Sequence, residues 1–171
     1  AEYCRKNNVP YLGICLGMQV AVIEFARNVL GIADADSGEF NRNCANKVID
    51  FLPDQSDSTD KGGTLRLGSY PCKTADGSLL QSCYGEKLIH ERHRHRYEFN
   101  NDYRGQMEAA GMVLSGTSPD DYIVEAVELP KNDFFIGVQY HPEFKSRPNK
   151  PAPLFVGLVK RRLNGKENKQ K

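Results

Sequence analysis

The sequence lacks the features that mark membrane and secreted proteins. No apolar run among its 171 residues approaches the roughly 20 residues that a bilayer-spanning helix needs. The first ten residues, AEYCRKNNVP, lack the apolar core of a signal peptide. The five cysteines form no C-x-x-C pair and show no zinc-type spacing, so we expect reduced thiols. These absences predict a soluble, cytoplasmic protein without a membrane partner.

The sequence also lacks an excess of charge of either sign. Its formal net charge is +1, so no overall field favours nucleic acid or a membrane as partner. The exception is local: ERHRHRYEFN, residues 91–100, would suit a solvated basic edge, a phosphate-binding strip or a nucleic-acid contact. Because few aromatic residues interleave with these cations and no basic excess exists elsewhere, we expect no nucleic-acid partner.

The length fits one domain with a single core. Strand-like runs alternate with helical patterns, and three late strands follow one another. This order predicts an α/β three-layer sandwich with a mostly parallel central sheet and an antiparallel extension. We expect one domain over residues 1–164 and a frayed polar tail over residues 165–171. The chain opens without Met on what reads as the end of a helix, so we expect a fragment that lacks the first part of its domain.

Hydrophobic periodicity and turn residues place the individual elements. Extended segments are expected at residues 9–14, 47–52, 64–74, 93–100, 112–118, 122–129 and 134–140. Helices are expected at residues 16–30, 78–85, 102–111 and 152–163. Residues 33–46 are expected to be irregular, and residues 53–63 form a flexible loop by composition.

A thiol lies between two glycines in YLGICLGMQ, residues 11–19, where an apolar run ends and a helical pattern begins. In this G-x-C-x-G pattern, Cys15 would occupy a sharp strand-to-helix turn, like the G-x-S-x-G elbow of hydrolases. The amide dipoles at the start of the helix would lower the thiol pKa and favour the nucleophilic thiolate. The alternative is a buried structural cysteine, and the elbow alone does not separate the two.

A base for this thiol is offered by GVQYHPEF, residues 137–144. His141 precedes a proline, which favours extended geometry, and residues two apart on an extended chain point to the same side. Glu143 would therefore orient the imidazole of His141, as the acid of a triad does. The pair follows an apolar strand, at the end where ligands gather in open α/β sheets. An ordinary loop is the alternative, but beside a cysteine elbow the pair predicts nucleophilic catalysis.

GICLGMQ followed far downstream by GVQYHPE resembles the class I glutamine amidotransferases in motif and order. The resemblance implies that Cys15 attacks the side-chain amide of L-glutamine, His141 carries the proton to ammonia, and Glu143 orients His141. Water would then hydrolyse the thioester and release glutamate. The main-chain amide of Leu16 is one natural donor of the oxyanion hole. In this family the other lies on a glycine-rich loop upstream of this chain, so we expect the isolated chain to be weakly active or inactive.

Four further segments resemble the glutaminase domain of the CTP synthases: RHRHRYE, GGTLRLG, EFAR and DADSGEF. In that family the domain follows a synthetase domain, and its ammonia serves the ATP-dependent amination of UTP to CTP. The resemblance implies no cofactor and no metal in this chain. The full enzyme would use ATP and Mg²⁺, respond to GTP as activator and form a homo-oligomer, a tetramer. The alternatives are another class I glutaminase, such as the GMP synthetase type, and a non-catalytic binding module of the same fold.

The resemblance also indicates which residues contact glutamine. A carboxylate suits the ammonium of glutamine, and a cation or an N–H donor suits its carboxylate. The implied substrate-binding set comprises the start of the helix, one acid and one base: Leu16, Gly17, Met18, Gln19, Glu39 and Arg96. Taken alone, Gln19 would be an ordinary polar helix residue and Glu39 a solvated loop charge.

The remaining thiols and cations carry weaker predictions. Four cysteines are expected to be structural or incidental: Cys4, Cys44, Cys72 and Cys83. Three histidines alternate with arginines: His90, His93 and His95. The like charge of the arginines would lower the pKa of these histidines and make them poor metal ligands. Three arginines are candidates for an effector or domain-contact surface: Arg66, Arg92 and Arg94.

Overall fold

The computed structural model describes residues 1–51 and 66–167, with side chains described as far as residue 163. The loop expected at residues 53–63 lies outside these residues, as do residues 168–171 of the expected tail. Within the two described ranges, no helix is both long and apolar enough to cross a bilayer.

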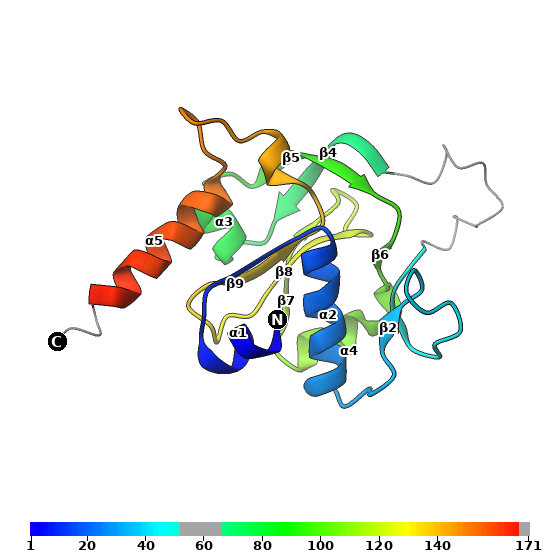
Figure 1. The fold of residues 1–171 in the computed structure, drawn as a ribbon. Helices are drawn as coiled ribbons and strands as arrows, with labels where there is room; N and C mark the ends of the chain where they lie inside the picture. The colour runs from blue at the N-terminus through cyan, green and yellow to red at the C-terminus, as the bar shows by residue number, and fades with distance from the viewer. Residues whose placement is uncertain (52–65, 168–171) are drawn as a thin grey trace.

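A six-stranded sheet forms the centre of the fold, in the order β1-β9-β8-β7-β4-β5 (Figure 1). Its strands are β1 (Tyr11–Ile14), β4 (Arg66–Thr74), β5 (Leu88–His95), β7 (Val113–Thr117), β8 (Val124–Glu128) and β9 (Phe135–Val138). β1 and β9 run parallel, and the other neighbours in this sheet run antiparallel. The α/β fold with its antiparallel extension is confirmed, but the prediction of a mostly parallel sheet is wrong for the described strands of this sheet, because only β1 and β9 pair in parallel among them.

A three-stranded sheet lies to one side, beyond α2 as seen from α5 (Figure 1). It consists of β2 (Asp36–Ser37), β3 (Lys47–Asp50) and β6 (Glu98–Phe99). The irregular segment expected at residues 33–46 thus contains one short strand. Its two residues are extended because they pair with β3, a long-range contact that composition does not indicate.

Helices cover both faces of the central sheet. On one face α2 (Leu16–Asn28) and α4 (Arg104–Ala109) share a hydrophobic core with alternate residues of the strands. On the other face α3 (Leu79–Tyr84) and α5 (Pro153–Glu167) pack in a second core. Phe135 of β9 belongs to the first core and Ile136 to the second, because side chains alternate across a strand. The three-layer sandwich is confirmed.

The helix ends follow local chemistry. The chain opens on α1 (Glu2–Asn7), as expected. Ser78 caps α3 by accepting the N–H of Gln81, and Gly85 ends it at a φ of 71°. The helix expected at residues 102–111 starts with a 3₁₀ turn, η1 (Asn101–Tyr103), and continues as α4. α5 extends to Glu167, so the first residues of the expected tail are helical.

Two glycines let the start of α2 lie directly on the sheet. A Cβ on Gly13 of β1 would lie 2.6 Å from the carbonyl carbon of Gly17. A Cβ on Gly137 of β9 would lie 2.9 Å from the Cα of Met18. Both distances are shorter than carbon atoms tolerate, so any side chain would push α2 away from β1 and β9. The glycines thereby fix where the helix begins, and with it the place of Cys15.

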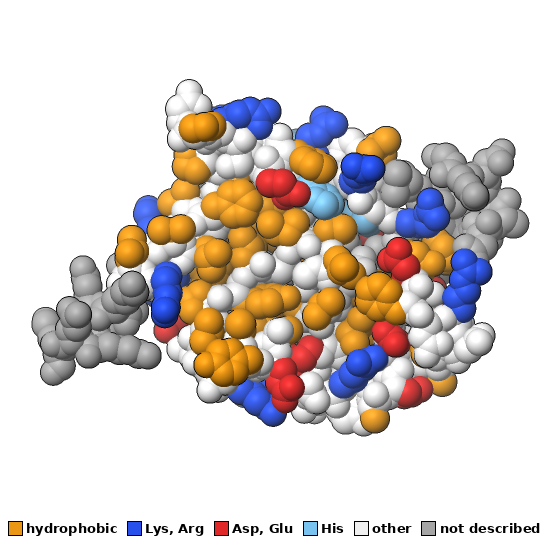
Figure 2. Space-filling model, in the orientation of Figure 1, with side chains coloured by type: hydrophobic (Ala, Val, Ile, Leu, Met, Phe, Trp, Pro, Cys, Tyr) orange, Lys and Arg blue, Asp and Glu red, His pale blue; other side chains and the backbone are white. Residues whose placement is uncertain are grey.

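Hydrophobic side chains gather on the face that Figures 1 and 2 present, between α5 and α2. β1 is an edge strand of the described sheet, and its Leu12 and Ile14 are only partly buried. On α5, Val159 and Leu163 are more than half exposed. The edge strand therefore borders an apolar surface.

Candidate active site

Cys15 occupies the expected turn between β1 and α2. Its φ of 51° and ψ of −103° form a conformation that residues other than glycine rarely adopt. The turn is held by the N–H of Cys15, which donates to the carbonyl of Val138 at 2.7 Å and so extends the pairing of β1 with β9. The strained residue at the head of a helix has the geometry of a nucleophile elbow. The strand-to-helix turn predicted from G-x-C-x-G is confirmed.

The surroundings of the thiol act on its pKa in opposite directions. Burial raises the pKa of Cys15, and the charges of Glu143 and Glu39 raise it further. The main-chain N–H of Leu16 and the side chain of Gln139 donate toward the sulfur and lower it. The net pKa lies above the ordinary value, so the prediction of a lowered pKa is wrong. The helix start does act as expected, but desolvation of the thiolate outweighs it.

His141 and Glu143 form a tight pair. The Nδ1 atom of His141 lies 2.6 Å from Oε1 of Glu143. The ring of His141 stacks on Phe144, with centroids 4.8 Å apart, and its main-chain N–H donates to the carbonyl of Arg92 at 2.8 Å. The other ring nitrogen, Nε2, is buried without a hydrogen-bond partner among the described residues. The imidazole is thus held on one side and has one nitrogen available for proton transfer.

Parallel pairing brings the two motifs to one edge of the sheet. Ile14 of β1 pairs with Val138 of β9. Cys15 follows the first, and His141 comes three residues after the second, where η2 (Pro142–Phe144) begins. Carboxyl ends of neighbouring parallel strands lie together, so residues far apart in sequence become neighbours.

A cavity of about 430 Å³ opens beside Cys15. Its walls contain Cys15, Leu16, Gln19, Glu39, Phe40, Arg94, His95, Arg96 and Tyr97. Four predicted substrate-binding residues line it: Leu16, Gln19, Glu39 and Arg96. The acid and the base predicted for the two ends of glutamine are thus on the walls of one cavity.

Two predicted contact residues do not line this cavity. The side chain of Met18 is fully buried in the core beneath α2. Gly17 lies at the helix start, where its carbonyl accepts the hydroxyl of Tyr11 at 2.7 Å. The side chain of Met18 supports the elbow from below, because it packs over Gly137. The side chain of Met18 does not reach the cavity, so the glutamine contact that the resemblance implies for Met18 stays a prediction for its main chain.

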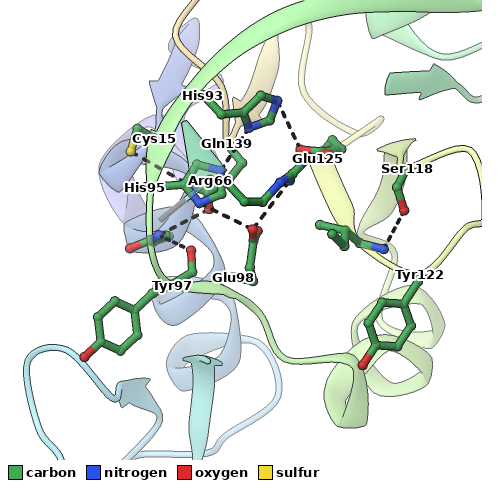
Figure 3. A network of polar contacts seen from close by, with 12 residues as sticks. Cys15, Arg66, His93, His95, Tyr97, Glu98, Ser118, Tyr122, Glu125 and Gln139 are labelled. Carbon is green, nitrogen blue, oxygen red and sulfur yellow. Dashed lines mark hydrogen bonds and ion pairs between the residues drawn. The ribbon is translucent and has the colours of Figure 1, made fainter. Parts of the chain in front are cut away.

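A ring of five buried ionisable side chains lies behind the cavity (Figure 3). Arg66 contacts Glu125 at 2.8 Å and Glu98 at 3.4 Å. His95 lies 3.4 Å from Glu98, the two imidazoles are 2.9 Å apart, and His93 lies 3.6 Å from Glu125. The ring connects β4, β5, β6 and β8, and its member His95 also lines the cavity.

Burial is the largest cause of the pKa shifts of His93, His95 and Glu98 in this ring of ionisable side chains. It lowers the pKa of His93 to about 2 and of His95 to about 3, with Arg66 as the next cause. For these two histidines the predicted direction is confirmed, but the cause differs: the adjacent Arg92 and Arg94 lie on the exposed face. Burial also raises the pKa of Glu98 to about 8.

Arg66 is not a surface cation. Its side chain is 11% exposed, and its guanidinium contacts the buried carboxyl groups of Glu98 and Glu125. The prediction that Arg66 belongs to an effector or domain-contact surface is therefore wrong, whereas Arg92 and Arg94 are exposed. The glycine-kinked β4 turns at Gly68, φ 113°, and carries Arg66 inward opposite His95.

Sequence reasoning missed Gln139, whose side-chain nitrogen lies 3.6 Å from the sulfur of Cys15. A signal for it was present, because Gln139 stands two residues before His141 and points to the same side of an extended chain. Glu98 and Glu125 gave no comparable signal, since only the paired strands bring them to Arg66.

The comparisons with known proteins agree with this geometry. The family model described as glutamine amidotransferase class-I matches residues 1–161. The CTP synthases of Staphylococcus saprophyticus and Staphylococcus aureus are 59% and 58% identical to this chain over 168 residues. Those residues are 98% of this chain but 31% of each relative, so the chain spans about a third of their length. The Trypanosoma brucei CTPS glutaminase domain with bound acivicin superposes with a TM-score of 0.88 at 38% identity, over 94% of this chain and 62% of that one.

Proposed function

We propose that this chain, which belongs to the class I glutamine amidotransferases, hydrolyses glutamine through Cys15, His141 and Glu143 and supplies the ammonia for CTP synthesis. One observation carries the proposal. The strained turn at Cys15 holds a thiol on a cavity whose walls also contain a carboxylate and a guanidinium. A packed structural cysteine needs neither the strain nor the cavity.

The chemistry begins with proton transfer from the thiol to Nε2 of His141, whose Nδ1 stays paired with Glu143. The sulfur of Cys15 attacks the amide carbon of glutamine, and the carbonyl oxygen becomes an oxyanion. The main-chain N–H beside the sulfur stabilises that charge. His141 returns the proton to the nitrogen, the C–N bond breaks, and ammonia leaves a thioester. Water, deprotonated by the same imidazole, attacks the thioester, and glutamate and the thiol are released.

Charge complementarity orients the substrate. Glu39 faces the α-ammonium of glutamine, and Arg96 faces its carboxylate by side chain or main chain. Gln19 binds glutamine through its side-chain oxygen, because its side-chain nitrogen already donates to the carbonyl of Tyr97 and to Oε1 of Gln139. The arrangement favours an amino acid over a simple amide, since both charged ends must be matched.

The rest of the reaction belongs to the longer protein. We infer that ammonia passes to a synthetase domain that aminates UTP in an ATP- and Mg²⁺-dependent reaction stimulated by GTP, within a homotetramer. None of these groups is assigned a site in this chain. Support for this step is the 59% identity to a CTP synthase.

We also expect the isolated chain to hydrolyse glutamine weakly or not at all. An oxyanion hole takes two donors, and loss of one costs about a hundredfold to a thousandfold in rate. The amide of Leu16 supplies one donor. Robust turnover by the isolated chain would show that the second donor also lies within it.

The test is covalent labelling of the full-length protein with a glutamine-mimicking diazoketone, located by peptide mass spectrometry. We expect the label on Cys15, and Cys15→Ala should lose at least about a thousandfold in glutaminase rate. Cys44→Ala is the matched control, since this half-buried thiol lies away from the cavity. Labelling of another cysteine, or full activity of Cys15→Ala, would refute the triad.

A product assay tests the acceptor. With glutamine, ATP and Mg²⁺, the full-length protein should convert UTP to CTP, and the Cys15→Ala variant should do so only when ammonia is added. Amination of a purine nucleotide instead would assign the chain to another member of the family.

A further inference from the structure

Three buried polar groups connect the wall of the cavity to the sulfur of Cys15 (Figure 3). The side-chain nitrogen of Gln19 donates to the carbonyl of Tyr97 at 3.1 Å and to Oε1 of Gln139 at 3.2 Å. The side-chain nitrogen of Gln139 lies 3.6 Å from the sulfur. Gln19 is 3% exposed and Gln139 is fully buried, so bulk water does not compete for these bonds.

The donor and acceptor at each step of this hydrogen-bond series follow from the carbonyl of Tyr97. A main-chain carbonyl only accepts, so the side-chain group of Gln19 facing Tyr97 must be its NH₂. That NH₂ also faces Gln139, which fixes Oε1 as the near atom of the second amide. The NH₂ of Gln139 is then turned toward Cys15. The hydrogen-bond partners thus determine both amide orientations.

We propose that Gln139 is a further functional residue of the glutaminase site, where its amide donates to the sulfur of Cys15 and stabilises the thiolate, while Gln19 and the carbonyl of Tyr97 hold that amide in the donating orientation. The inference rests on the proposed function, in which Cys15 is the nucleophile. A donor is needed there because the sulfur is partly desolvated and Glu143 and Glu39 add negative charge nearby. Hydrogen bonds to a charged acceptor are stronger than those to a neutral one, so the bond favours the ionised thiol.

This role separates Gln139 from a packing residue. An apolar side chain of equal length would fill the same space and keep the fold, but it would leave the sulfur without this donor. Packing changes alter unfolding; loss of the donor alters the pH at which Cys15 ionises. The pH dependence of thiol alkylation therefore distinguishes the two roles.

The experiment measures alkylation of Cys15 by iodoacetamide against pH in the full-length protein, with peptide mass spectrometry separating Cys15 from the other thiols. In Gln139→Met we expect the midpoint to rise by about one pH unit, which is about a tenfold slower reaction below the midpoint. Gln19→Met should shift the midpoint in the same direction by less, because the amide of Gln139 is then free to rotate. Gln106→Met, on the exposed side of α4, is the matched control and should not shift it.

The outcomes separate the inference from the function on which it rests. An unmoved midpoint in folded Gln139→Met overturns the role of Gln139, while diazoketone labelling of Cys15 still supports the triad. A shifted midpoint without diazoketone labelling in the parent protein supports the hydrogen bond and refutes the glutaminase. If circular dichroism shows that Gln139→Met does not fold, the neutral variant Gln139→Leu replaces it, and a midpoint that does not rise in folded Gln139→Leu overturns the proposal.

Discussion

The two faces of β5 carry basic residues that are adjacent in sequence but lie in opposite surroundings. Along Leu88–His95 every second residue is buried. His93 and His95 point inward and are 1% and 6% exposed, whereas Arg92 and Arg94 are exposed. The inward histidines are neutral members of a buried ring with Arg66, and the outward arginines meet solvent. In a run such as RHRHR, alternate residues therefore belong to two different surfaces, one buried and one exposed, and the composition of the run does not distinguish them.

The buried face of β5 therefore supports the site, and its exposed face presents charged side chains to solvent. The buried ring ties His95, a cavity residue, to strands β4 and β8 through Glu98, Arg66 and Glu125. The exposed face includes Arg94, which lines the cavity. Substitutions on the two faces should consequently differ in kind: inward changes alter folding, and outward changes alter binding.

The largest loss of folding stability is expected from Arg66→Met. It leaves the buried carboxyl groups of Glu98 and Glu125 without their cation, and loss of one partner from a buried ion pair costs about 3 to 5 kcal/mol. The measurement is the urea concentration at which the fully buried thiol of Cys72 in β4 becomes reactive, resolved by peptide mass spectrometry. Arg92→Met on the outward face is the matched control and should change unfolding by less than about 0.5 kcal/mol. Equal effects of both variants would abolish the distinction between the faces.

A smaller change in folding stability is expected when Glu98 titrates. Its folded pKa of about 8 lies above the unfolded value, so the folded protein retains a proton that the unfolded chain has released. Stability from this group is present at low pH and is lost as the pH rises toward 8. Below about pH 6.5 the buried histidines act in the opposite sense, because the unfolded chain then binds their protons.

The test therefore compares the free energy of unfolding at about pH 7 and pH 8, where titration of Glu98 dominates its pH dependence. We expect this free energy to fall by an amount on the order of 1 kcal/mol. Glu98→Gln should remove most of this slope, since the amide does not titrate. The same Cys72 reactivity assay, corrected at each pH for the reactivity of the unfolded thiol, gives the midpoint. A slope that persists unchanged in Glu98→Gln would assign the titration to another group.

The smallest effect on folding is expected from Arg92→Ala, an outward change. If this face contacts an effector or the synthetase domain, GTP should stimulate the variant several-fold less while unfolding stays within about 0.5 kcal/mol of the parent. Glutaminase rates with and without GTP, measured on the full-length protein, provide the comparison. Unchanged stimulation would remove Arg92 from the predicted effector or domain-contact surface.

Local signals predicted most of the elements. The G-x-C-x-G turn, the apolar run before it and the helical pattern after it all depend on neighbours in sequence, and β1, Cys15 and α2 follow them. β2 escaped prediction because its two residues are extended only through pairing with β3. Arg66 was misassigned for the same kind of reason: its partners Glu98 and Glu125 are distant in sequence.

Neighbours in sequence are enough to predict the turn at Cys15, the spacing of His141 and Glu143, and the alternation of strands and helices, since each depends on dihedral preferences and side-chain periods within a few residues. The tertiary structure decided the rest. Parallel pairing of β1 with β9 brings Cys15 and Gln139 together, and the burial that follows raises the thiol pKa against the helix start. Desolvation depends on everything packed around a group, and that information is not carried by its neighbours in sequence.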